Sequence, residues 1–103
     1  LNEDNIIYMY EEWFEKLAQK LNIKNVYQNK NSIEIVLSEE LISKVSVDDI
    51  FMDAFYISNM FRFISKGTNL IIVLDIIKLE KHPIYYLVSL LDKIYSRYKN
   101  SID

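Results

Sequence analysis

The chain has 103 residues, half of them apolar, and its 12 lysines and arginines against 15 acidic residues give a formal net charge of −3. Residues 1–103 are therefore expected to form a single domain with one core, and one glycine and one proline leave little room for a disordered linker. The acidic balance, with its signs interspersed, argues against a nucleic-acid-binding face, and the lack of cysteine excludes disulfides and thiolate metal sites.

The first periodic segment runs from about Ile6 to Leu21, where apolar residues recur at helical spacing. Asp4 is the expected N-cap. Trp13, together with Ile6 and Met9, widens the apolar stripe beyond what packing against a single sheet requires. Two interpretations of Trp13 stay open, a broad core face and a contact with a neighbouring domain, and we favour the core face.

From Lys24 the hydrophobic period falls to two, which predicts a β-hairpin. Residues 29–31, NKN, supply its turn, because asparagine tolerates a positive φ better than other residues that have a side chain. The following string EELISKVS, residues 39–46, has no clean period. It predicts an irregular or single-turn connection.

A short helix is predicted from Ser46 to about Tyr56, with Ser46 as the N-cap and Asp49 three residues later, as in a capping box. Asp48 and Asp49 also admit an interpretation as metal ligands. We favour a helix start, because no other carboxylate or histidine is spaced to complete a metal site.

Two further strands, MFRFIS and NLIIVLDII, flank the only glycine and predict a second hairpin. Gly67 indicates a turn with positive φ and not a phosphate loop, since no helix with a lysine and serine pattern follows it. Residues 70–77 are apolar on both faces apart from Asp75, which predicts a central strand. Arg62 is expected to face solvent between two core-facing phenylalanines.

The last helix is predicted to open at Pro83 and to keep its period through Tyr98, with Leu87 and Leu91 on the buried face. His82 has no partnering serine, cysteine or acid, which favours an exposed residue before the helix over a catalytic base. The order helix, hairpin, helix, hairpin, helix predicts an α+β domain, with short helices packed on a mainly antiparallel sheet.

No nucleophile elbow, phosphate loop, zinc spacing or dinucleotide fingerprint occurs in the sequence, so we expect no catalytic activity, cofactor or metal in this domain. Eight tyrosines leave an RNA-binding interpretation open, but most of them lie in predicted helices. No apolar run approaches the roughly 20 residues of a membrane span, and the acidic start does not fit a signal peptide. We therefore expect a soluble cytoplasmic domain without a membrane partner, whose surface serves protein contact.

The stretch KLAQKLNIKNVYQNKNSIEIVL, residues 16–37, resembles the helix-to-hairpin junction in the C-terminal domain of the bacterial transcription-repair coupling factor (Mfd) family. There a helix ends in a phrase of the type A-x-x-L-G-I before an isoleucine-rich strand. Ala18, Leu21, Asn22 and Ile23 occupy the phrase here, and Asn22 stands in place of the usual glycine. The likeness continues through the second hairpin into the closing helix and so covers nearly the whole chain.

The resemblance implies a non-catalytic regulatory domain of a DNA translocase that removes stalled RNA polymerase and recruits nucleotide excision repair. It also implies that ATP is bound by motor domains elsewhere in that parent. In the family this domain packs against a UvrB-like module and covers the surface that binds UvrA, which is an autoinhibitory contact. The alternative is a free-standing protein- or RNA-binding α+β module.

Candidate contact residues follow from strand alternation and helix phase, without help from the family. The sheet face away from the helices is expected to carry Tyr27, Glu34, Arg62 and Asp75, and Trp13 joins them from the first helix. Exposed charges on a sheet can pair across a domain interface without being buried in the domain's own core. These five residues form the predicted partner-binding set.

Overall fold

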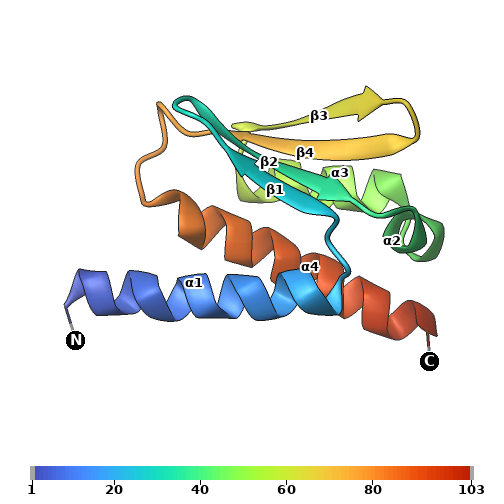
Figure 1. The fold of residues 1–103 in the computed structure, drawn as a ribbon, viewed down its shortest axis with the longest axis horizontal. Coiled ribbons are helices and arrows are strands. Elements are labelled where there is room, and N and C mark those ends of the chain that lie inside the picture. The colour runs from blue at the N-terminus through green and yellow to red at the C-terminus, as the bar shows by residue number, and fades with distance from the viewer. Residues whose placement is uncertain (1, 103) are drawn as a thin grey trace.

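The fold consists of four helices and one four-stranded antiparallel sheet in a computed structural model that describes residues 2–102. The predicted α+β class is confirmed. In chain order the elements are α1 (Glu3–Lys20), β1 (Asn25–Gln28), β2 (Ser32–Leu37), α2 (Glu39–Lys44), α3 (Val47–Ile57), β3 (Phe61–Lys66), β4 (Asn69–Asp75) and α4 (Pro83–Ile102) (Figure 1). Two helices, and not the single predicted one, separate the two hairpins.

Helix α2 lies in the stretch predicted to be an irregular or single-turn connection. The irregular alternative is wrong, and the helix that forms is slightly longer than the single turn that was the other alternative. The Ser38 hydroxyl accepts a hydrogen bond from the Leu41 N–H at 3.2 Å, and Glu39 and Glu40 lie in the first turn, where the helix dipole favours acids. Leu41 is fully buried in the core. The six residues of α2 span fewer than two turns, which is too short for a helical period to be visible in the sequence.

Helix α1 begins earlier than predicted, and Asn2, not Asp4, is its N-cap. The Asn2 side-chain oxygen accepts a hydrogen bond from the Asn5 N–H at 2.9 Å. Asp4 instead lies in the first turn, where its charge complements the helix dipole. Both residues are good N-caps by type, and the sequence pattern alone does not rank them.

The end of α1 is a Schellman motif, with Asn22 in the left-handed region at φ +53°. The Asn22 N–H donates to the Gln19 carbonyl at 3.1 Å, and the Ile23 N–H donates to the Ala18 carbonyl at 2.9 Å. The expected left-handed cap at Asn22 is therefore present. Its side-chain amide also donates to Glu40 at 3.1 Å, which connects the end of α1 to α2.

Replacing Asn22 with alanine is expected to lower the free energy of unfolding by about 1 kcal/mol more than replacing it with glycine, because only alanine carries a β-carbon into the left-handed conformation. Both variants lose the hydrogen bond to Glu40. The difference between them therefore isolates the backbone strain, and paired urea melts measure it. Equal stabilities of the two variants would contradict the assigned conformation.

The sheet has the strand order β1-β2-β4-β3, and every neighbouring pair is antiparallel. Strand β4 is central, as predicted from its two apolar faces. The two hairpins are joined through β2 and β4, where Ile35 lies opposite Ile72. Strands β1 and β3 form the two edges.

The turn between β1 and β2 does not use a positive φ, contrary to expectation. Within residues 2–102, Asn22 is the one non-glycine residue with positive φ. The Asn29 side-chain oxygen instead accepts hydrogen bonds from the N–H groups of Asn31 and Ser32, at 2.8 and 2.9 Å. The turn is therefore stabilised by side-chain hydrogen bonding. The expected positive φ is found at Gly67, in the second hairpin.

One face of the sheet packs on the helices and forms the main core. Figure 1 shows α1 and α4 side by side below the sheet and no helix above it. Leu87 and Leu91 of α4 are buried in this core, as predicted. The sheet contributes the alternate residues of its central strands, Ile33, Ile35 and Leu37 from β2 and Leu70, Ile72 and Leu74 from β4.

A partly buried ion pair joins α3 to α4. Asp53 is only 5% exposed, and its carboxylate accepts two hydrogen bonds from the Arg97 guanidinium, at 2.6 and 2.9 Å. This contact raises the pKa of Arg97. Asp49 lies 3.4 Å from the same guanidinium, and Ser46 makes no side-chain cap bond. The predicted capping box is therefore wrong, because Asp49 is turned toward Arg97.

Candidate functional site

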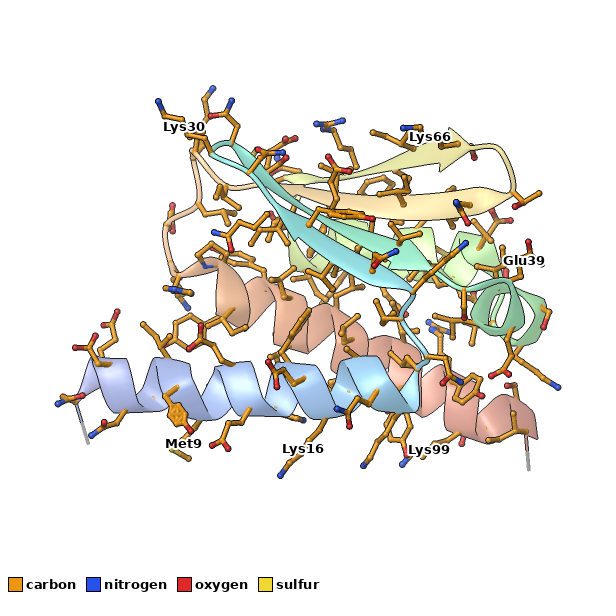
Figure 2. All side chains as sticks on the ribbon, in the orientation of Figure 1. Met9, Lys16, Lys30, Glu39, Lys66 and Lys99 are labelled. Carbon is orange, nitrogen blue, oxygen red and sulfur yellow. The ribbon has the colours of Figure 1, made fainter. Side chains whose placement is uncertain are left out.

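The face of the sheet that no helix covers, here called the outer sheet face, is the first candidate site. Alternate strand residues point to the same side, so the register between strands defines its members. They are Asn25, Tyr27, Ser32, Glu34, Val36, Arg62, Ile64, Lys66, Asn69, Ile71, Val73 and Asp75. Figure 2 shows the Lys66 side chain above the sheet, on this face.

The centre of the outer sheet face is apolar and packed. Val36, Ile71 and Val73 form a second hydrophobic cluster, separate from the main core. Val73 is fully buried although no helix lies over it, and in register it is flanked by Glu34 and Arg62. We infer that the longer side chains of its neighbours cover it.

Charged side chains surround this apolar centre. The Arg62 Nε donates to Asp75 at 2.9 Å, with side chains 53% and 42% exposed. The hydrogen bond to Asp75, aided by the charges of Asp75 and Glu34, raises the pKa of Arg62. Such solvated pairs contribute only about 0–1 kcal/mol to stability. Their charges therefore remain available to a partner at little cost to the fold.

Four of the five predicted contact residues lie together on this face. Tyr27 is opposite Glu34, and Glu34 is separated from Arg62 only by Val73, so these residues form one row across all four strands. Asp75 joins the row through its bond to Arg62. Tyr27 is 54% exposed, which leaves most of its ring open to a partner.

Trp13 does not join this row, because α1 lies on the opposite side of the sheet. Its ring packs against that of Tyr10 with centroids 5.6 Å apart. Trp13 and Met9 are 42% and 56% exposed, so the predicted broad core face is wrong for these two residues. In Figure 2 Met9 points away from the sheet.

Sequence analysis missed a second exposed apolar patch, on α3. Met52, Phe55 and Tyr56 are 65%, 54% and 89% exposed. The Phe55 ring meets Phe63 of β3 edge to face at 5.8 Å, which anchors the patch to an edge of the sheet. The signal in the sequence was that these three large side chains lie on the side of the helix opposite Ile50 and Ala54, which are buried.

A groove of about 670 Å³ lies between α1 and the edge strand β1. Its floor is apolar, with Phe14 and Ala18 of α1 facing Ile33 of β2 and Leu87 of α4. The rim is polar and is lined by Glu11, Glu15, Gln19, Gln28 and His82. No serine, threonine or cysteine lines it.

His82 lies at the mouth of this groove as an exposed residue before α4, as predicted. Its Nδ1 accepts a hydrogen bond from the Ile84 N–H at 3.1 Å, which caps the first turn of α4. In the described range 2–102, no three histidine, cysteine or acidic side chains are grouped to hold a metal ion. No helix in that range combines the length and apolarity needed to cross a bilayer.

No family model, curated protein or solved structure matches the chain. The observations that bear on function are therefore the surfaces described above. The outer sheet face exposes Tyr27 and Ile64 beside charged residues, and the groove has an apolar floor with glutamates at its rim. This arrangement is typical of sites that bind other proteins.

Proposed function

We propose that this is a non-catalytic regulatory domain that docks onto another domain of its parent protein through the outer sheet face. The observation that carries the proposal is that no helix covers this face, where Tyr27 and Ile64 stay 54% and 37% exposed beside the charged residues Glu34, Arg62 and Asp75. Exposed aromatic and apolar side chains bordered by charges are common in protein interfaces. An RNA partner fits less well, because basic and acidic residues are balanced on this face and Tyr27 is its single aromatic residue.

The likeness to the transcription-repair coupling factor supplies a partner, the UvrB-like module of the same chain. On this proposal the docked domain covers the UvrA-binding surface, and engagement of RNA polymerase shifts the population to an undocked state. The ATP-driven motor would lie elsewhere in the parent, in the cytoplasm. The left-handed conformation of Asn22 is compatible with the glycine that the family phrase carries at that position.

Reversible docking requires a face whose side chains are well solvated when the domain is undocked and well paired when a partner covers them. The exposed Arg62–Asp75 pair meets the first requirement, because its charges are solvated before docking. Charges at the margin of an interface set orientation and association rate more than affinity. A contact of modest size is the usual form of such an interface between domains.

Deleting residues 1–103 from the full-length parent is expected to increase UvrA capture. The reason is linkage: a domain that stabilises the closed form lowers the apparent affinity of any ligand that binds only the open form. A pull-down with purified UvrA on wild type and deletion measures the effect. Unchanged or weaker capture by the deletion would defeat the autoinhibitory proposal.

A charge reversal tests the surface itself. Arg62→Glu or Asp75→Lys in the parent is expected to reproduce part of the deletion phenotype while the domain stays folded, because the pair contributes little to stability. Lys93→Glu is a matched control, since Lys93 is an exposed residue of α4, away from the outer sheet face. If the control raises UvrA capture as much as the reversals do, the outer sheet face is not the contact.

A further inference from the structure

We propose that the free edge of β1, together with the groove beside it, binds an extended basic and apolar peptide segment of a partner protein as an added strand of the sheet. This site is distinct from the outer sheet face. Three features carry the proposal: the backbone groups of β1, the floor of the groove, and the charge of its rim.

The edge of β1 offers unpaired backbone groups. In an antiparallel ladder, alternate residues direct both N–H and C=O to the neighbouring strand. The Asn29 N–H donates to the Ser32 carbonyl at 3.0 Å, and Tyr27 lies opposite Glu34 in the same register, so Tyr27 also faces β2. Val26 and Gln28 therefore direct their N–H and C=O groups away from the sheet.

This edge lacks two features that commonly block strand addition, charged side chains and proline. All four residues of β1, Asn25–Gln28, are exposed, and none is charged or proline. The other edge strand, β3, carries Arg62 and Lys66. Charged side chains and proline are common protection against edge pairing. Of the two edge strands, β1 therefore has fewer features that would prevent the pairing of an added strand.

The groove provides a place for the side chains of the added strand. Val26 and Gln28 of β1 line it from above, and Phe14 and Ala18 of α1 line its floor. A strand paired to β1 would direct every second side chain toward α1. At about 670 Å³ the groove lies in the size range of ligand sites, roughly 300–1,000 Å³. Branched apolar residues at successive inward positions would fill it.

The rim selects the charge of the occupant. Glu11 and Glu15 of α1 border the groove, no lysine or arginine lines it, and neither glutamate takes part in an ion pair within the described residues. A segment whose apolar residues are flanked by lysine or arginine complements this rim. A second copy of the chain is disfavoured, because pairing β1 with β1 would bring two acidic rims together.

The experiment uses the blocked peptide acetyl-KTITITK-amide, whose two lysines lie on the same strand face as its isoleucines and flank them, labelled with a fluorophore and titrated with the whole chain by anisotropy. Wild type is expected to bind it, and the acidic analogue acetyl-ETITITE-amide is not. A version of the basic peptide with N-methylated isoleucines keeps its charges but loses alternate backbone donors, so it is expected to lose binding. Binding of the N-methylated peptide as tight as that of its parent would overturn strand addition, as would a failure of the basic peptide to bind.

Protein variants locate the site. Val26→Pro removes an outward N–H that β2 does not use, and Glu11→Lys with Glu15→Lys reverses the rim. Each is expected to weaken binding at least about tenfold, which corresponds to roughly 1.4 kcal/mol. Glu39→Lys, an exposed acid on α2 far along the fold from the groove (Figure 2), is the matched control and should bind as wild type does.

Further outcomes separate this site from the alternatives. Circular dichroism and urea melts check that each variant folds. If Val26→Pro fails to fold, the binding measured for the rim variant and for the N-methylated peptide still tests the proposal. If the wild type is a dimer and Val26→Pro makes it a monomer, the occupant of the β1 edge is a second copy of the chain and not a peptide of a partner protein. That result would overturn the proposal. Arg62→Glu should leave peptide binding unchanged, so the outer sheet face and the groove can fail independently.

Discussion

Replacing Leu91 with alanine is expected to lower the free energy of unfolding by about 2 to 5 kcal/mol, and Leu87→Ala should fall in the same range. Leu91 is fully buried and Leu87 is 4% exposed, both on the face of α4 that packs in the main core. Truncation removes buried methyl groups and leaves a cavity that the surrounding side chains fill only partly. Urea melts of the purified chain measure the loss.

The neighbouring Asp92 gives the control for this prediction. It is exposed on the solvent side of α4, so Asp92→Ala should change stability by no more than about 0.5 kcal/mol. The contrast tests the phase of the helix. Similar losses for Leu91→Ala and Asp92→Ala would mean that α4 is rotated relative to the core.

Replacing Arg97 with methionine is expected to cost about 2 to 3 kcal/mol. The variant leaves the Asp53 carboxylate, which is 5% exposed, without the guanidinium that donates both of its hydrogen bonds. Uncompensated buried charges destabilise by roughly 3–5 kcal/mol, and we take a lower figure because the Arg97 side chain is 36% exposed and water reaches it. Denaturant melts at constant pH measure the effect.

Two variants distinguish a buried pair from a surface one. Asp53→Leu combined with Arg97→Met removes both charges and should lose less stability than Arg97→Met alone, because no buried charge is left unpaired. Arg62→Met breaks the exposed pair with Asp75 and should cost no more than about 1 kcal/mol. If Arg97→Met is as mild as Arg62→Met, Asp53 is better solvated than its burial indicates.

The two proposed surfaces lie on different parts of the fold and suit partners of different structure. The outer sheet face has a packed centre and an ion pair at its margin, which suits a folded domain. The β1 groove has free backbone groups and an acidic rim, which suits an extended segment. Occupying the groove does not cover Arg62 or Asp75, so the charge reversals on the outer sheet face test that surface separately.

Local patterns in the sequence determined the fold class, both hairpins and the position of α4. These features depend on residues close together in the chain: Pro83 fits only the start of a helix, and Asn22 and Gly67 fit left-handed positions. Strand alternation also predicted that Tyr27, Glu34, Arg62 and Asp75 share a face. A period of two follows from the pleat of each strand alone.

Tertiary packing decided the remainder. The pairing of β2 with β4 sets which residues cover Val73, and the pairing of Asp53 with Arg97 joins residues 44 positions apart. Trp13 stayed exposed although its helix is amphipathic, because burial of α1 depends on how far α4 and the sheet extend over it. The groove exists because α1 packs against α4 and leaves the edge of β1 uncovered. Such features depend on distances between elements, and local periodicity carries no information about those distances.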